Sequence, residues 1–485
     1  MGDASLLLIL ATPLVGAVLV LLSGKSPNLR ETLSILTGAA LVAQVISIAP
    51  SVFSGQTPSA MLATPVPGLP LALALEPLGL LFALIASALW IVTTVYAIGY
   101  MRGHGESNQT RFFAFFAIAI SATMGVALSA NLITLFLFYE LLTLSTYPLV
   151  THAGTDEARR GGRVYLGILI GTSMAFLLPA IVATWYLAGT TDFHAGGILA
   201  GKASGLATGI LFALFAFGIG KAALMPFHRW LPAAMVAPTP VSALLHAVAV
   251  VKAGVFSILK IAVYVFGIDL LAQNGARDLL LWVVAITILG ASIIAMNQDN
   301  LKRRLAYSTI SQLSYVVLGA VLATAAGITG AAIHIATHAV GKITLFFCAG
   351  AILVAAHKTR VSELDGLGRQ MPITMGAFLI ASISIAGLPP MAGMWGKWYL
   401  AAGALDANYM ILVGVLMVST LLNIAYLLPI PIRAFFKDPD APMNEIKEAP
   451  LPCLIAIVIT SAACIILFFY PSLLLRFAEP LVSLR

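Results

Sequence analysis

Long apolar runs separated by short polar segments recur along the whole 485-residue chain. Each run is long enough for an α-helix to cross a hydrocarbon layer of ~30 Å. The apolar residues are continuous rather than alternating, which favours helices over a β-barrel. The pattern therefore predicts an all-α polytopic membrane protein. Its fourteen predicted spans cover residues 5–23, 33–53, 78–100, 111–129, 131–151, 162–188, 205–234, 240–266, 277–296, 305–323, 327–355, 372–400, 407–434 and 451–475.

The first apolar run lacks a basic flank and a small-residue cleavage site, so we expect a retained first span. The three cysteines lie in or beside apolar runs and lack the spacing of haem, iron–sulfur or disulfide sites. No Walker motif or dinucleotide-binding glycine motif is present, which argues against a nucleotide-driven pump. We therefore expect no cofactor and no metal.

The net charge of +7 has a topological origin. Of the 26 lysines and arginines, sixteen fall in or beside loops that follow odd-numbered spans, and four fall on the opposite side. Basic residues accumulate on the cytoplasmic side of membrane proteins. We therefore expect a multi-pass protein of the inner (cytoplasmic) membrane with both termini on the non-cytoplasmic side, and no nucleic-acid partner.

Six basic residues remain inside predicted spans, and of the nineteen acidic residues only Glu140 lies in the middle of one. A charge at a helix centre costs roughly 2.5–3.5 kcal/mol on insertion scales, so several together need partners, water or neutralisation. Buried ion pairs and side chains that reach the interface are the purely structural alternative, which is strongest near the ends of the spans. The six basic residues are Lys221, Arg229, Lys252, Lys260, Lys342 and Lys397.

The functional interpretation of these charges is a proton path. Burial disfavours the charged form of a lysine or a glutamate, whereas pairing the two favours both charged forms. Moving Glu140 and Lys221 together or apart would therefore change their proton affinities in steps. A row of such groups, each reached by water in turn, can carry protons across a membrane.

The predicted span at 327–355 contains "HIATHAVGK", which places His334, His338 and Lys342 at positions i, i+4 and i+8. This spacing puts the three side chains on one helix face. Two histidines and a lysine on one face of a membrane helix favour a proton relay over simple packing. Metal binding by the two histidines is the alternative, and no third ligand accompanies them.

Prolines interrupt two of the predicted spans, at "MPFHRWLP" (225–232) and "GLPPMAGMWGK" (387–397). Proline removes a backbone donor and clashes with the preceding turn, so both helices should break. The breaks are five spans apart, which indicates two inverted five-helix repeats of the kind found in transporters. We expect spans 1–3 in residues 1–110, the repeats in 111–266 and 277–434, and the last span with its tail in 451–485.

Four stretches stand out: "PFHRWLPAAMVAPTPVSALLHAVAVVKAG" (226–254), "NLKRRLAYSTISQLSY" (300–315), "HIATHAVGKITLFF" (334–347) and "GLPPMAGMWGKW" (387–398). Together they resemble the antiporter-like subunits of respiratory complex I, Mrp-type Na⁺/H⁺ antiporters and membrane-bound [NiFe] hydrogenases. The resemblance implies a fold of fourteen core helices with the inverted repeat, and proton conduction through ionisable groups in the middle of the membrane. It extends from about the third span to the thirteenth.

The resemblance also implies roles for individual residues in proton transfer. The matching positions are Glu140 on span 5, its pairing residue Lys221 on span 7, His246 and Lys252 on span 8, His334, His338 and Lys342 on span 11, and Lys397 on span 12. Two positions depart from the family pattern. Ala233 replaces an aspartate found in many relatives, and Arg229 is not a family feature.

Chain length and the lysine at position 397 favour a D-type Mrp subunit, whereas "SALLH" is more like the longer subunits. We therefore expect a Na⁺/H⁺ antiporter subunit without a redox or hydrolytic site of its own. Its partners would be other membrane subunits, H⁺, Na⁺ and lipids. The alternatives are a proton-pumping subunit of a complex I-like NADH:quinone oxidoreductase or a hydrogenase, a stand-alone secondary transporter, and a structural scaffold.

Overall fold

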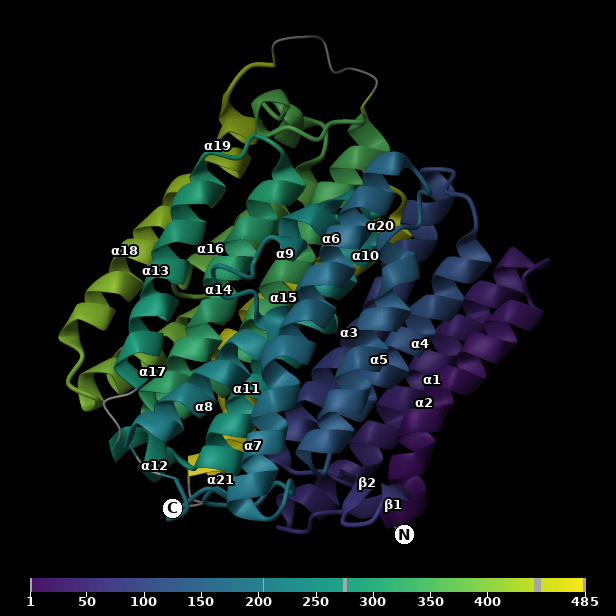
Figure 1. The fold of residues 1–485 in the computed structure, drawn as a ribbon. Coiled ribbons are helices and arrows are strands. Elements are labelled where there is room, and N and C mark those ends of the chain that lie inside the picture. Colours follow the sequence, from purple (N-terminus) through teal and green to yellow (C-terminus); the bar gives the residue numbers. More distant parts are fainter. Residues whose placement is uncertain (1, 204, 274–276, 440–445, 483–485) are drawn as a thin grey trace.

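The computed structural model describes residues 2–203, 205–273, 277–439 and 446–482. Figure 1 shows one bundle of helices, with a small hairpin, α12 and α21 at one end and α19 at the opposite end. Within the described ranges, eleven helices are long and apolar enough to cross a membrane, and two shorter apolar helices accompany them. The expectation of a multi-pass helical membrane protein is confirmed.

Two of the N-terminal helices begin at a capping side chain. Asn131 caps α5 by accepting a hydrogen bond from the Thr134 N–H, and Thr155 caps α6 in the same way from Ala158. These short polar side chains satisfy backbone donors that the first helical turn leaves unpaired. The helices are α1 (Gly2–Leu22), α2 (Pro27–Phe53), α3 (Pro77–Gly103), α4 (Gln109–Ala127), α5 (Leu132–Val150), α6 (Asp156–Thr172) and α7 (Leu178–Ala188), the last two joined by a π-helical turn.

Two helices of the C-terminal half form the centre of the bundle. In the most apolar stretch of α14, 94% of the residues are buried, and in α15 78%, against 33% in α1 and α20. Helix α15 packs against α14, α16, α17 and α20. The helices of this half are α13 (Arg277–Met296), α14 (Leu301–Leu322), α15 (Ala325–Ala356), α18 (Met410–Leu427), α19 (Pro429–Phe436), α20 (Leu451–Phe469) and α21 (Ser472–Val482).

An antiparallel hairpin corrects the strictly all-α expectation. Strands β1 (Ser59–Val66) and β2 (Leu69–Ala74) pair from Ser59–Ala74 to Val66–Leu69. Pro67 and Gly68 form the turn between them, with Gly68 at a φ of +80° that favours glycine. The segment between α2 and α3 is short and rich in turn residues, so it forms a hairpin instead of a further helix.

The two spans with internal prolines are interrupted, as predicted. Helix α8 (Gly205–Gly218) gives way to a single 3₁₀ turn at Gly220–Ala222, and helical structure resumes at the short α9 (Trp230–Ala233). Helices α16 (Pro372–Ala386) and α17 (Gly393–Asp406) flank the second break. Irregular backbone at this depth is tolerated where protein surrounds it.

The segment predicted as one continuous span at 240–266 is also irregular. It consists of α10 (Thr239–Ala243), a π-turn at Leu244–Val248, α11 (Val250–Ile261) and a second π-turn at Ala262–Phe266, followed by α12 (Ile268–Gln273). A π-turn inserts one extra residue into a helix and requires no proline or glycine. The apolar pattern of the sequence therefore does not predict the π-turns.

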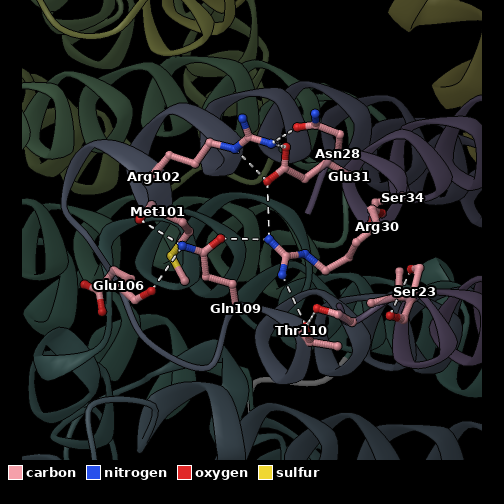
Figure 2. Close-up of polar contacts among 12 residues, drawn as sticks. Ser23, Asn28, Arg30, Glu31, Ser34, Met101, Arg102, Glu106, Gln109 and Thr110 are labelled. Atoms are coloured by element: carbon pink, nitrogen blue, oxygen red, sulfur yellow. Dashed lines mark hydrogen bonds and ion pairs between the residues drawn. The ribbon is translucent and has the colours of Figure 1, made fainter. Parts of the chain in front are cut away.

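A polar cluster ties α2 to α3 and α4 (Figure 2). The Glu31 carboxylate accepts hydrogen bonds from Arg102 at 2.5 and 3.0 Å and from Arg30 at 3.3 Å. Arg30 also donates to Gln109 Oε1 at 2.8 Å. Arg30 and Glu31 are both buried, so these charges connect the helices inside the protein.

Candidate functional site

The first helix break places Lys221 inside the protein. The residue lies in the single 3₁₀ turn after α8, and its side chain is fully buried. The Trp230 indole N–H donates to the Gly220 carbonyl at 2.9 Å, so the two sides of the break are joined. Gly254 of α11 packs directly on the turn: a Cβ atom there would lie 2.5 Å from the Lys221 carbonyl carbon.

Neutral oxygen atoms of α5 hold the Lys221 ammonium. Its Nζ donates to the Tyr139 carbonyl at 2.8 Å and to the Thr143 hydroxyl at 2.5 Å. Glu140 is adjacent on the same helix, and its Oε1 is buried without a hydrogen-bond partner among the described residues. Glu140 and Lys221, which were predicted to pair, therefore lie on neighbouring segments. No ion pair within 4.0 Å joins these two described side chains.

Lys252 of α11 meets the histidines of α15. Its buried Nζ lies 2.5 Å from Nδ1 of His338. One helical turn away on α15, the His334 ring stacks on the His338 ring with centroids 5.8 Å apart. The i, i+4 spacing recognised in the sequence therefore places the two imidazoles in contact.

Lys252, His338 and His334 form a row of buried side chains, and helix α14 extends this row beyond His334. Nε2 of His334 lies 3.1 Å from the Gln312 amide oxygen, and the His334 ring stacks on Tyr315 with centroids 5.4 Å apart. Lys397 Nζ lies 5.0 Å from the centroid of the same tyrosine ring. Tyr315 thus lies between His334 of α15 and Lys397 of α17, and Gln312 contacts His334.

The second break positions Lys397. Its ammonium donates to the Ala386 carbonyl at 2.8 Å, where α16 ends, and to the Thr420 hydroxyl of α18 at 3.2 Å. Gly387 follows at a φ of +80°, and a Cβ atom there would lie 2.4 Å from Cδ of Lys397. The break therefore supplies both an unpaired carbonyl and the space for the lysine side chain.

Lys342 lies on the same face of α15, one helical turn beyond His338. Its Nζ donates to the Ser308 hydroxyl of α14 at 2.5 Å, and the Tyr426 hydroxyl of α18 donates to the same oxygen at 2.8 Å. All three side chains are buried.

Three residues singled out in the sequence stand apart from this row. Lys260 forms an ion pair with Glu76 at 2.8 Å. Arg229 lies at the first break and is exposed, which agrees with the structural alternative of a side chain that reaches the surface. Its place in a proline-containing turn lets the side chain reach the surface. The side chain of His246 lies outside the described residues.

Several polar partners of the site lysines and histidines were not identified from the sequence, because neutral polar residues are common in apolar spans. Thr143, Gln312, Tyr315 and Ser308 each contact a site lysine or histidine. The last three belong to "NLKRRLAYSTISQLSY", the stretch already noted as family-like, so this was the available signal. Among the described residues, no three histidine, cysteine or acidic side chains are placed to hold a metal ion.

The region that contains the row also carries the family match. Residues 129–423 match the family described as "NADH:quinone oxidoreductase/Mrp antiporter, TM". NADH-quinone oxidoreductase subunit N of Desulforudis audaxviator is 32% identical over 384 residues, which cover 78% of this chain and 75% of that protein. NAD(P)H-quinone oxidoreductase chain 5 of a Picosynechococcus species is 31% identical over 359 residues, 69% of this chain and 51% of that protein. The matched part of this chain thus spans about half of that longer relative.

Two solved structures share the fold over nearly the whole chain. One is from the Mrp complex of Dietzia sp. DQ12-45-1b, with a TM-score of 0.88 at 22% identity, covering 99% of this chain and 96% of that one. The other is from the membrane-bound sulfane sulfur reductase, an archaeal respiratory membrane complex, with a TM-score of 0.86 at 25% identity, covering 98% and 77%. The chain therefore belongs to the family of membrane-spanning subunits shared by NADH:quinone oxidoreductases and Mrp antiporters.

Proposed function

We propose that this protein is a proton-translocating subunit of a multisubunit membrane complex. The observation that carries the proposal is the row of buried ionisable side chains from Lys252 through His338 and His334 to Lys397, with Tyr315 between the last two. Buried ionisable groups in membrane helices are costly, and they are typical of ion and proton pathways. Protons enter near Lys221 and Lys252, pass the histidines and Lys342, and leave around Lys397.

The same proposal includes the finer architecture. Eleven long spans, the two short apolar helices and the irregular segment 239–266 together correspond to the fourteen expected spans. Two inverted repeats, 111–266 and 277–434, then each contribute one broken helix and one lysine at the break, between N-terminal spans in 1–110 and the final segment 451–485. The unequal distribution of basic residues supports both termini on the non-cytoplasmic side of the inner membrane.

In the proposed mechanism, Glu140 and Lys221 form the switch. The Lys221 ammonium rests on neutral oxygens in this structure, and the Glu140 oxygen has no hydrogen-bond partner among the described residues. A shift that brings the carboxylate to the ammonium would stabilise the protonated lysine, and separation would favour release of the proton. In this proposal, the contacts of Lys221 with neutral oxygens represent the separated arrangement.

Monovalent cation/H⁺ antiport of the Mrp type is the activity we favour. The chain matches nearly the full length of its structural counterpart in an Mrp complex. The lysine at position 397 on span 12 also favours a D-type Mrp subunit. A redox-driven proton pump is the second candidate, because the sequence relatives are named as quinone oxidoreductase subunits and the second structural counterpart is part of a respiratory complex. Other chains would then carry the electrons.

Three substitutions test the proton path: Lys221→Ala, Glu140→Ala and Lys397→Ala. In everted membrane vesicles each should abolish cation-driven proton movement, measured with a pH-sensitive dye, while the amount of assembled complex stays normal. Arg229→Ala is the matched control, since it removes an exposed cation at the same helix break and should leave transport intact. Full transport by any of the three variants would contradict the role given to that residue.

A further inference from the structure

The ion pair between Lys260 and Glu76 lies beside a pocket that the proposed proton row does not use. Lys260 is eight residues beyond Lys252 on α11, which places it about 12 Å further along the helix. Glu76 is the residue just before α3. Both side chains line a pocket of about 630 Å³, at the end of the molecule that carries the hairpin and α21 (Figure 1).

Two oxygen atoms converge on the Lys260 ammonium. Its Nζ lies 2.8 Å from Oε1 of Glu76 and donates to the Ser129 carbonyl at 2.8 Å. The rings of Phe193 and Phe256 lie on its other sides, with centroids 4.7 and 5.5 Å away. The side chain of Lys260 is 1% exposed and that of Glu76 is 13% exposed, so Glu76 is the member of the pair with partial access to the pocket.

The Glu76 carboxylate requires one positive charge beside it. A buried carboxylate without a cation is strongly unfavourable, and the ammonium supplies that cation here. A carboxylate oxygen and a backbone carbonyl oxygen are also the ligands that hard cations prefer. A single carboxylate balances one unit of charge, so a monovalent ion suits the site better than a divalent one.

The geometry points to a monovalent-cation site formed by the Glu76 carboxylate and the Ser129 carbonyl, at which one alkali cation such as Na⁺ exchanges for the proton of Lys260. Na⁺ binds to the two oxygens, the N–H bond of the ammonium breaks, and the proton passes to water in the pocket. Lysine is left as a neutral amine, and the charge of the site is unchanged. The inference rests on the proposed antiport activity, for which it supplies the cation site.

The test is Na⁺ binding to the purified, intact complex, measured by calorimetry and by thermal unfolding, with choline chloride at equal ionic strength as the reference. The wild-type complex should be stabilised by Na⁺ and not by choline. Because one proton leaves for each ion bound, the half-saturating Na⁺ concentration should fall about tenfold for each unit rise in pH.

Substitutions test which residues of the pocket are needed for Na⁺ binding. Glu76→Gln should lose the Na⁺ response, whereas Glu479→Gln, an exposed residue on the same pocket, should keep it. Lys260→Met should bind Na⁺ independently of pH, because no proton is then exchanged. If that variant does not fold, the double variant Glu76→Gln/Lys260→Met, which carries no buried charge, should fold and show no Na⁺ response.

Equal effects of Na⁺ and choline on the wild type, or a retained Na⁺ response in Glu76→Gln, would overturn the cation site. The proposed function is judged separately, by proton movement in vesicles. Normal transport with no Na⁺ binding at Glu76 would reject only the cation site. Intact Na⁺ binding with no transport by the wild type would reject only the proposed function.

Discussion

At the scale of single residues, the five buried lysines differ in what their ammonium groups contact. Lys221 and Lys397 donate to carbonyl and hydroxyl oxygens, Lys342 donates to a serine hydroxyl, and Lys252 lies against an imidazole. Only Lys260 has a carboxylate as its ion-pair partner among the described residues. Neutral partners stabilise the ammonium less than a carboxylate does. Four of the lysines are therefore suited to releasing a proton, and the fifth needs a replacement cation.

The loop carboxylate Asp365 allows a pH-dependence prediction outside the spans. It is buried and accepts hydrogen bonds from Arg433 at 2.7 Å and from Lys437 at 2.6 Å. Hydrogen bonds from Arg433, followed by those from Lys437, hold the pKa of Asp365 below its ordinary value of 3.8. The stabilisation is therefore fully present above that value and is lost as the pH falls through the lowered pKa.

Asp365→Asn should lower the free energy of unfolding at pH 7 by about 1–2 kcal/mol, a modest loss because Arg433 and Lys437 are 42% and 53% exposed. Thermal unfolding in detergent at pH 7 and pH 3 measures the difference from the wild type, which should shrink at pH 3. Asp438→Asn is the control, since that carboxylate is 88% exposed and pairs only weakly with Arg369. A difference that persists unchanged at pH 3 would rule out ionisation as its cause.

The sequence indicated the ionisable members of the candidate site and little of their surroundings. Lys252, His334, His338 and Lys397 were recognisable because charge and imidazole are rare in apolar spans. Glu76 was overlooked because it precedes a predicted span, and its partner Lys260 is far away in the chain. A contact between such distant residues depends on packing, which hydropathy does not report.

At the scale of elements, the two helix breaks share one design. Each places a lysine next to a backbone carbonyl at the end of a helix or in a turn. At the first break the carbonyl of Gly220 is tied to Trp230, and at the second the carbonyl of Ala386 accepts from Lys397 directly. Prolines in the sequence predicted both breaks. The π-turns on either side of α11 carry no such marker, which is why that irregularity was missed.

Trp230→Phe tests whether the first break must be held rigidly. The indole N–H is lost, although the Gly220 carbonyl keeps the Ala223 N–H at 2.9 Å, so the cost in unfolding free energy should be only about 1 kcal/mol. The turn that carries Lys221 would be less well positioned, and the transport rate should fall about tenfold or more. Rates in vesicles, normalised to assembled complex, provide the measurement.

Trp282→Phe is the corresponding control, because Trp282 is exposed on α13 and should tolerate the change. If the transport rate of Trp230→Phe equalled that of the wild type, the link between Trp230 and Gly220 would have no part in positioning Lys221.

At the scale of the whole molecule, the row includes side chains of α14 and α15, two largely buried helices. Lys252 comes from α11, the histidines from α15, Tyr315 from α14 and Lys397 from α17, so the row joins segments from both proposed repeats.

The driving force distinguishes the two candidate complexes. For an Mrp-type antiporter, a Na⁺ gradient imposed on vesicles without any electron donor should move protons, because exchange needs only the two ions. A redox-driven pump would require an electron donor and an acceptor, and it would not respond to the Na⁺ gradient alone. We expect Na⁺-driven proton movement that is absent in Lys397→Ala, recorded with a pH-sensitive dye. Identification of the co-purified proteins gives an independent check: small antiporter subunits would agree with this expectation, whereas iron–sulfur or flavin subunits together with donor-dependent proton movement would refute it.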